Sequence, residues 1–160
     1  MKNRILYSML LMMSLLLTPS CSSDNDSINS NNNSVEIAQI ENEVESGIWV
    51  ITSFVDSGQD ETNNFINYNF TFSTNGTLIA NNGTITMTGT WSVTTSSNSN
   101  DDSSSNDDID FNIFFPVPET NDFEDLIDDW EIVTHNSNTI SLIDVSGGNG
   151  DTDILVFQKN

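Results

Sequence analysis

Apolar and polar residues alternate along most of the chain that follows Gly47. The clearest run covers residues 85–94, where one face carries only Thr and Ser. The other face of this run is formed by Ile85, Met87, Gly89, Trp91 and Val93. A strand with one apolar and one polar face is typical of an antiparallel sheet that covers a core on one side. We therefore predict a mainly β domain, in which Gly89 marks a bend or a bulge.

Seven further segments have strand-like patterns, and turns rich in Asn, Ser and Gly separate most of them. Two of the turns, Asn75-Gly76 and Asn82-Gly83, are strong hairpin signals because both residue types accept positive φ. The seven segments are 49–55, 68–73, 78–80, 109–115, 130–135, 139–145 and 153–158. Eight antiparallel strands in a meander predict an up-and-down barrel, with a flattened sandwich as the alternative.

Two short segments have apolar residues at helical spacing. The first extends from Val35 to Gly47, with apolar positions at Ile37, Ile40 and Val44. The second begins at Asn121, which together with Glu124 has the form of an N-terminal capping box. It continues with Phe123, Leu126, Ile127 and Trp130. We therefore predict a short N-terminal helix and a short helix between the fifth and sixth strands.

Two other segments lack a hydrophobic pattern. Residues 22–34 contain Ser, Asn and Asp with one Ile, and residues 95–107 contain no apolar side chain. So little apolar surface does not offset the entropy lost on ordering the chain. We therefore predict a flexible tether and a mobile loop.

The N-terminus has the architecture of an export signal. Two basic residues precede an apolar run from Ile5 to Leu17, which is shorter than the roughly 20 residues that span a bilayer. Cys21, the single cysteine of the chain, directly follows Thr18-Pro19-Ser20. A cysteine in this position resembles the lipobox cysteine of bacterial lipoproteins, although Leu17 lies one residue further out than the leucine of that motif.

The lipobox resemblance implies removal of residues 1–20 and acylation of Cys21. A single cysteine has no partner for a disulfide, which favours an anchor over a disulfide-bonded secreted domain. Two or more acyl chains hold a protein stably on a membrane. We therefore expect an outer membrane lipoprotein of the Gram-negative envelope, with an ordinary secretory peptide as the alternative. Its domains are a signal peptide (1–20), an acylated tether with a short helix (21–45) and a barrel domain (46–160).

The segment after Cys21 resembles two short envelope motifs. Residues 23–26 resemble the acidic signal that follows the acylated cysteine in some lipoproteins displayed on the cell surface. Asp26-Ser27-Ile28 resembles the Asp-Ser/Thr-apolar acceptor of bacterial O-glycosylation. These resemblances imply surface exposure and glycosylation at Ser27.

The chain is strongly acidic, with 24 Asp and Glu, 3 Lys and Arg, and a formal net charge of −21. Removal of the leader leaves Lys159 as the only Lys or Arg. A surface of this charge repels the phosphates of nucleic acids and anionic headgroups. We expect no nucleic acid partner and no cofactor, and a monomeric protein that reaches the membrane through its lipid anchor.

Several motifs of the predicted barrel resemble lipocalin-like lipoproteins of Gram-negative bacteria. They are Gly47-Ile48-Trp49, Tyr68-x-Phe70-x-Phe72, Asn75-Gly76-Thr77 and Gly89-Thr90-Trp91-Ser92-Val93. In lipocalins a Gly-x-Trp at the start of the first strand packs the tryptophan across the closed end of the barrel, and Trp49 matches that position. Lipocalins also tend to place a late arginine against this tryptophan, but no arginine follows Arg4 here.

The lipocalin resemblance implies a barrel interior that accepts a small apolar ligand. The side chains expected there are Phe70, Phe72, Met87, Trp91, Phe111 and Ile113. The alternative is that these side chains fill the barrel, as is common in eight-stranded barrels. An open interior predicts a binding module for a small apolar ligand or lipid. A filled interior predicts an interaction lipoprotein whose packed barrel binds a protein or glycan.

Few residues point to catalysis or to metal binding. His135 is the only histidine, and neither a Gly-x-Ser-x-Gly motif nor a second thiol accompanies it, so we expect an exposed residue at a strand end and no enzyme. A weak calcium candidate surrounds the Gly-rich turn near the C-terminus, with oxygen ligands from Asp144, Asn149, Asp151 and Asp153. A Gly-rich hairpin needs no metal to form, so we favour a structural turn over a metal site here.

Overall fold

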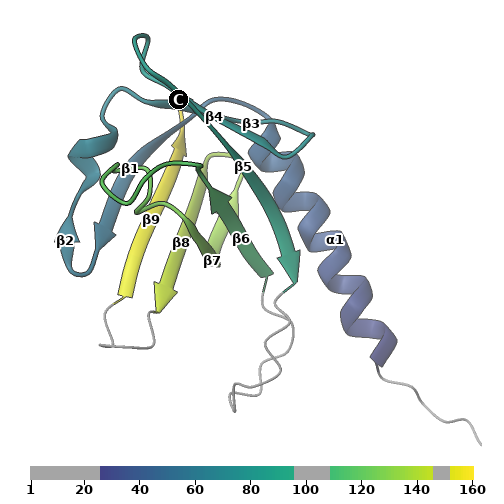
Figure 1. Ribbon diagram of the computed structural model, residues 1–160. Coiled ribbons are helices and arrows are strands. Elements are labelled where there is room, and N and C mark those ends of the chain that lie inside the picture. The colour runs from purple at the N-terminus through teal and green to yellow at the C-terminus, as the bar shows by residue number, and fades with distance from the viewer. Residues whose placement is uncertain (1–25, 96–108, 146–151) are drawn as a thin grey trace, which may run out of the picture.

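The strands form one closed antiparallel barrel (Figure 1). The computed structural model describes residues 26–95, 109–145 and 152–160. The barrel strands are β1 (Trp49–Asp56), β3 (Asn69–Phe72), β4 (Thr77–Asn81), β5 (Thr86–Thr95), β6 (Ile109–Phe114), β7 (Asp128–Asn136), β8 (Thr139–Val145) and β9 (Thr152–Lys159). Each pairs with its neighbour in this order, and β1 also pairs with β9. The predicted eight-stranded barrel is confirmed, and the sandwich alternative is not.

The hairpin turns are those that the sequence predicts. Gly76 and Gly83 have φ angles of +77° and +86°, in the region where a side chain is disfavoured. The structure adds one element that the hydrophobic pattern does not reveal. A two-residue strand, β2 (Gln59–Asp60), pairs with the end of β1, and a 3-10 turn, η1 (Thr62–Phe65), follows it.

A β-bulge in β1 decides which of its side chains face the core. Ile51 pairs with Phe157 of β9, but the next pair joins Ser53 to Val156, so Thr52 is an extra residue. The extra residue reverses the alternation of the strand. Trp49 and Ile51 before the bulge and Phe54 after it are therefore all buried. Strict alternation along the sequence would place Ile51 and Phe54 on opposite faces of β1. The bulge places both on the core face.

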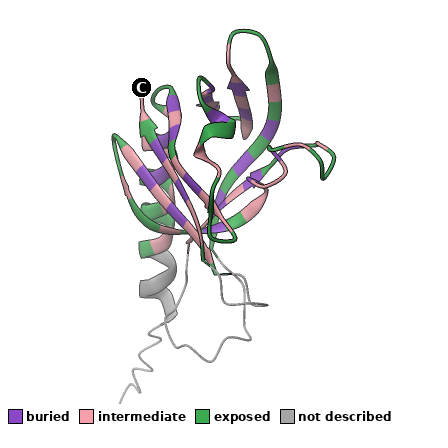
Figure 2. Cartoon of the chain, turned by 90° about the vertical axis from the view of Figure 1, so that its left-hand side faces the viewer, coloured by how far each residue is buried: buried purple, intermediate pink, exposed green. Residues whose placement is uncertain are grey.

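Buried and exposed residues alternate along the strands (Figure 2), and the buried ones form a single core. The core is rich in aromatic rings. Its largest fully buried side chains include Trp49, Trp130, Phe54, Phe65, Phe70, Phe72, Phe111, Phe115 and Phe157. Burial of this much aromatic surface is the main favourable contribution to folding of a barrel without disulfides.

The N-terminal helix is longer than the sequence predicts. α1 extends from Asp26 to Glu45, so the tether predicted over residues 22–34 is helical from Asp26 onward. Once a helix has nucleated, each added residue gains one hydrogen bond. Ile40 and Val44 are buried against the barrel, where α1 contacts β3, β5 and β7.

The predicted helix between β6 and β7 is wrong, because these residues form successive turns. Asn121 does act as a cap, since its Oδ1 accepts a hydrogen bond from the Phe123 backbone N–H at 3.0 Å. The backbone bonds that follow join residues three apart, from Glu124 N–H to Asn121 O and from Ile127 N–H to Glu124 O. The turns allow Phe123 to reach the core, where it lies 4.9 Å from the Phe115 ring.

Gly89 marks a close approach of two segments and not a bulge. Its pairing with Leu78 continues the register of β4 and β5 without a shift. A Cβ at this position would overlap the carbonyl oxygen of Phe114 and lie 2.7 Å from Cδ1 of Phe115. The absence of a side chain therefore lets the end of β6 cross β5.

We expect Gly89→Ala to destabilise the barrel by about 2 to 3 kcal/mol, because a backbone oxygen and a buried ring must both move. The free energy of urea unfolding measures this loss. Thr88→Ala, on the exposed face of the same strand, is the matched control and is expected to change stability by less than about 1 kcal/mol. Equal effects of the two variants would contradict the close approach.

Candidate functional site

The side chains predicted to line the barrel interior pack against one another. Phe70, Phe72, Trp91, Phe111 and Ile113 are buried in the core, and Met87 is partly buried against it. The Phe72 ring centroid lies 5.4 Å from that of Trp91 and 5.7 Å from that of Phe111. Trp91 and Phe111 stack at 5.7 Å with an interplanar angle of 26°. The part of the barrel that these residues line is therefore occupied by side chains, as in the filled-barrel alternative.

Phe123 adds a second layer of aromatic packing from outside the strands. Its ring lies 5.4 Å from Phe65 and 5.0 Å from Tyr68, in nearly perpendicular arrangements. Both partners belong to the segment between β1 and β3, so two irregular connections meet through these rings. Edge-to-face pairs of this kind contribute about 0.5 to 1.5 kcal/mol each beyond the area that they bury.

Trp49 joins the helix, the first strand and the last strand. Its Nε1–H donates to the Val44 carbonyl at 2.8 Å, and the Lys159 ammonium lies 4.9 Å from the centre of its ring system. Lys159 also donates to Ser46 Oγ at 3.1 Å. Gly47, at φ +150°, leaves room for the lysine, because a Cβ there would lie 3.0 Å from Lys159 Cε. Lys159 therefore makes a cation–π contact with Trp49.

His135 is not the exposed strand-end residue that the sequence predicts. Val133 is an extra residue in β7, because Ile132 pairs with Leu142 while His135 pairs with Ile140. Ile140 and Leu142 both face the core, so the bulge turns His135 to the inner face of the strand. Nδ1 of His135 lies 2.8 Å from Oε2 of Glu43, and Nε2 lies 3.8 Å from Oε1 of Glu36.

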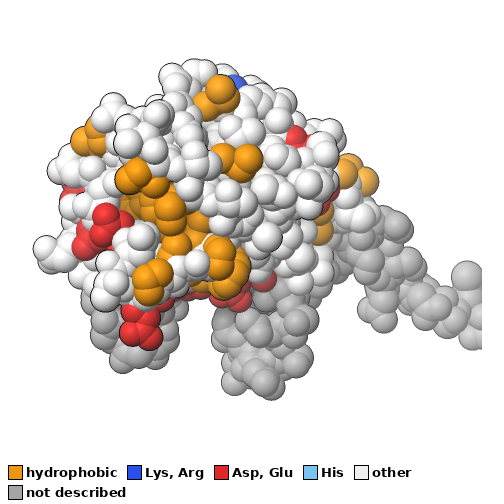
Figure 3. Space-filling model, turned by 45° about the horizontal axis from the view of Figure 1, so that its top comes forward, with side chains coloured by type: hydrophobic (Ala, Val, Ile, Leu, Met, Phe, Trp, Pro, Cys, Tyr) orange, Lys and Arg blue, Asp and Glu red, His pale blue; other side chains and the backbone are white. Residues whose placement is uncertain are grey.

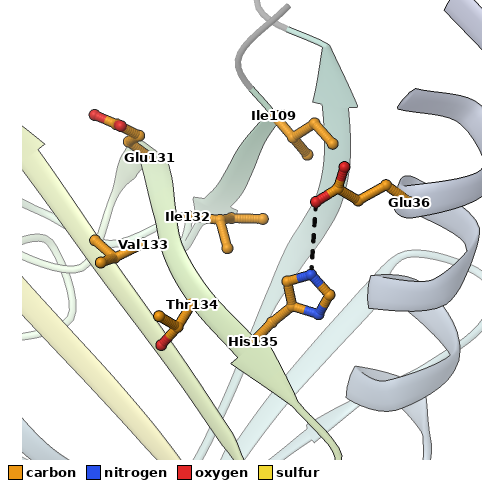
Figure 4. Close-up of a pocket in the computed structure, with 7 residues that line it drawn as sticks. All are labelled: Glu36, Ile109, Glu131, Ile132, Val133, Thr134 and His135. Atoms are coloured by element: carbon orange, nitrogen blue, oxygen red, sulfur yellow. Dashed lines mark ion pairs between the residues drawn. The ribbon is translucent and has the colours of Figure 1, made fainter. Parts of the chain in front are cut away.

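Glu36 and His135 border a cleft between α1 and β7 with a volume of about 430 Å³. Ile109 and Ile132 point into it, and Glu36 reaches across from the helix toward His135 (Figure 4). Glu131, Val133 and Thr134 complete its lining. The histidine contacts two carboxylates of the helix. These contacts hold α1 against β7.

The charges at this cleft favour the ionised form of Glu43. Partial burial raises the pKa of the Glu43 carboxyl, but hydrogen bonds with His135 and Gln39 and the positive charges of His135 and Lys159 outweigh this effect. The pKa of Glu43 therefore lies below its ordinary value of 4.5. The ionised carboxylate stabilises the folded state above that value, and this contribution is lost as the pH falls through the pKa of the folded protein.

A second hollow, with a volume of about 560 Å³, crosses the outer face of β5 and β6. Asn75 and Gly76 border it on one side, and Ile127 and Asp128 border it on the other. Partial burial, the side-chain hydrogen bond with Asp129 and the negative charges of Asp144 and Asp129 raise the pKa of Asp128 to about 6. The Asp129 backbone N–H, which donates to Asp128 Oδ1 at 2.8 Å, acts in the opposite direction. This hollow is called the β5–β6 groove below.

The structure tests the calcium candidate only in part. Asp144 and Asp153 pair across β8 and β9, and Asp153 Oδ1 accepts a hydrogen bond from the Ser57 backbone N–H at 2.7 Å. Asn149 and Asp151 lie outside the described residues. Within the described ranges, no three His, Cys, Asp or Glu residues are arranged to hold a metal ion.

The envelope motifs lie in or near the N-terminal part that the structure does not describe. Cys21 is outside the described residues, and Ser27 lies in the first turns of α1. Among the residues that are described, no helix is both long enough and apolar enough to cross a bilayer. The anchor and the glycosylation site therefore stay predictions.

We expect Glu43→Gln to lower stability by about 0.5 to 1 kcal/mol at neutral pH, because the variant loses the charge that His135 and Lys159 attract. The difference from the wild type should shrink as the pH falls below the ordinary value of 4.5, where the wild-type carboxylate also becomes protonated. Urea unfolding at several pH values measures it. Glu41→Gln, on the same helix, is the control, and the same pH profile in both variants would contradict the role of the His135 contact.

The sequence matches no protein-family model and no curated protein. Among solved structures, the chain is similar to a DUF4847 family protein from Bacteroides vulgatus ATCC 8482, with 20% sequence identity and a TM-score of 0.48. The similarity covers 76% of this chain and 97% of that chain. The function of the protein must therefore be inferred from its own residues.

Proposed function

We propose that the protein is a lipoprotein of the Gram-negative cell envelope, anchored through acylated Cys21, and that its barrel is a non-catalytic binding module. The module engages a protein or glycan partner through its outer surface. It is not a carrier that encloses a small apolar ligand. The anchor rests on the leader and on the position of the single cysteine.

The packing of the interior is the observation that carries this proposal. A carrier needs a space lined by apolar side chains that contact the ligand more than one another. Here Phe72, Trp91 and Phe111 contact one another, and Phe123 closes against Phe115 and the segment before β3. The two hollows described above both open at the outer surface. Hydrophobic side chains and scattered acidic groups share one face of the molecule (Figure 3).

The chemistry of the described residues supports a binding role over a catalytic one. The histidine contacts two carboxylates of α1, and the only thiol of the chain is the predicted site of acylation. A nucleophile needs an adjacent base, and among the described residues Thr134, which lines the same hollow as His135, makes no hydrogen bond with its ring. The strongly acidic chain also disfavours anionic partners.

We expect Cys21→Ala, expressed with a secretory leader that is cleaved without acylation in place of residues 1–20, to move most of the protein from the membrane pellet to the soluble fraction of the expressing cells, because the acyl chains would be lost. Fractionation followed by immunoblotting measures the change. Ser22→Ala keeps the cysteine and is the matched control, so it should stay in the pellet. Retention of both variants in the pellet would contradict the anchor.

We further expect the soluble Cys21→Ala protein, purified from its host, to show the mass of the chain alone in native mass spectrometry. A filled barrel has no room for a stoichiometric guest. The spectrum is repeated after incubation with a lipid extract of the host, and wild-type protein in detergent serves as the control. An apolar adduct of one molecule per chain, released on denaturation, would show a carrier and overturn the outer-surface proposal.

A further inference from the structure

The β5–β6 groove has a defined floor. Thr90 pairs with Phe114 and Ser92 pairs with Asn112 across the two strands, so these four side chains share the outer face. Thr90 and Ser92 are exposed, Asn112 is half-buried, and the Phe114 side chain is 52% exposed. Phe114 is the only aromatic residue among the large exposed hydrophobic residues of the described part of the chain, and it is the one of them that lines this hollow.

The polar groups around the ring are hydroxyls, amides and a carboxyl. Asn112 Nδ2 donates to Thr94 Oγ1 at 3.0 Å, which holds the amide in place before any ligand binds. Asn75 Oδ1 accepts the Thr77 backbone N–H at 3.1 Å, which likewise orients its amide. Hydroxyl and amide groups both donate and accept hydrogen bonds, so they match a ligand that is itself rich in hydroxyls.

The charges near the groove exclude an anionic ligand. The sole Lys or Arg beyond the leader, Lys159, is engaged with Ser46 and Trp49, which do not line the groove. Asp128 lies at the rim, and Asp129 follows it in β7. A carboxylate, sulfate or phosphate group in the groove would meet these acids without a cation to offset the repulsion.

We propose that the β5–β6 groove binds a neutral oligosaccharide, with one sugar ring stacked on Phe114. A pyranose presents a face of C–H bonds, which packs on an aromatic ring, and an edge of hydroxyls, which bond to amide, hydroxyl and carboxyl groups. Phe114 supplies the ring, Ser92 and Asn112 on the same outer face supply the polar contacts, and Asp128 lies at the rim. This inference deepens the proposed function by naming the partner class and the site.

A protein partner is less well matched to this groove. Protein interfaces place their energy in several large apolar or aromatic side chains surrounded by a wide contact area. Here a single exposed aromatic side chain lies beside Thr90, Ser92 and Asn112, with half-buried Ile127 at one edge, in a hollow of about 560 Å³. That volume accommodates a few sugar rings, and its lining hydrogen-bonds with hydroxyls.

The test is a glycan array probed with the full mature lipoprotein in detergent. The array carries neutral, amino-sugar and uronic or sulfated oligosaccharides, and titration calorimetry follows with any neutral oligosaccharide that binds. We expect binding to neutral members, and Phe114→Ala should weaken it at least about tenfold. Ile85→Ala removes an exposed apolar side chain outside the groove and should change affinity by less than about twofold. Ser92→Arg, which places a long side chain over the floor, should also abolish binding.

Several results would overturn the inference. They are binding of acidic glycans alone, unchanged affinity in both Phe114→Ala and Ser92→Arg, or no binding to any glycan. Capture of a protein that cross-links at residue 114 would assign the groove to a protein instead. None of these results affects the anchor or the filled interior, which the Cys21→Ala fractionation and the native mass spectra test separately.

Discussion

The pairing of β1 with β9 is the constraint on which the rest of the molecule depends. It closes the barrel, so that neither strand presents a long free edge. It also brings Lys159 beside Trp49 and leaves Gly47 as the residue with space for the lysine chain. Trp49 then donates to Val44, which attaches α1 to the closed barrel. The closure of the barrel, the attachment of α1 and the contact of Lys159 with Trp49 therefore all depend on the pairing of β1 with β9.

Two β-bulges determine which side chains of β1 and β7 face inward. The extra residue Thr52 lets β1 bury side chains on both sides of it, which strengthens the contact with β9. The extra residue Val133 turns His135 toward α1, where it meets Glu43. A histidine on the outer face of β7 would have no such partner on the helix. A β-bulge thus serves core packing in β1 and the contact of His135 with Glu43 in β7.

Because the interior is filled with side chains, we expect the protein to bind its partner on the outside of the barrel. An aromatic core holds the small domain together without disulfides, but it leaves no place for a guest among the rings that line it. Binding must then use the surface, where the β5–β6 groove combines an exposed Phe114 with polar side chains. The scarcity of cations restricts the partner further, since Lys159 is already engaged with Trp49.

The sequence by itself determined the strand content, the glycine turns and the inward faces of strands such as β5, because a period of two and positive φ are local properties. Only the tertiary structure decided the facing of His135, the turns around Phe123 and the filling of the interior. The sequence misplaced the first two because a bulge reverses the alternation of β7, and because packing of Phe123 against Phe115 prevailed over local helical spacing. Filling depends on how residues from distant strands meet, and no local pattern records it.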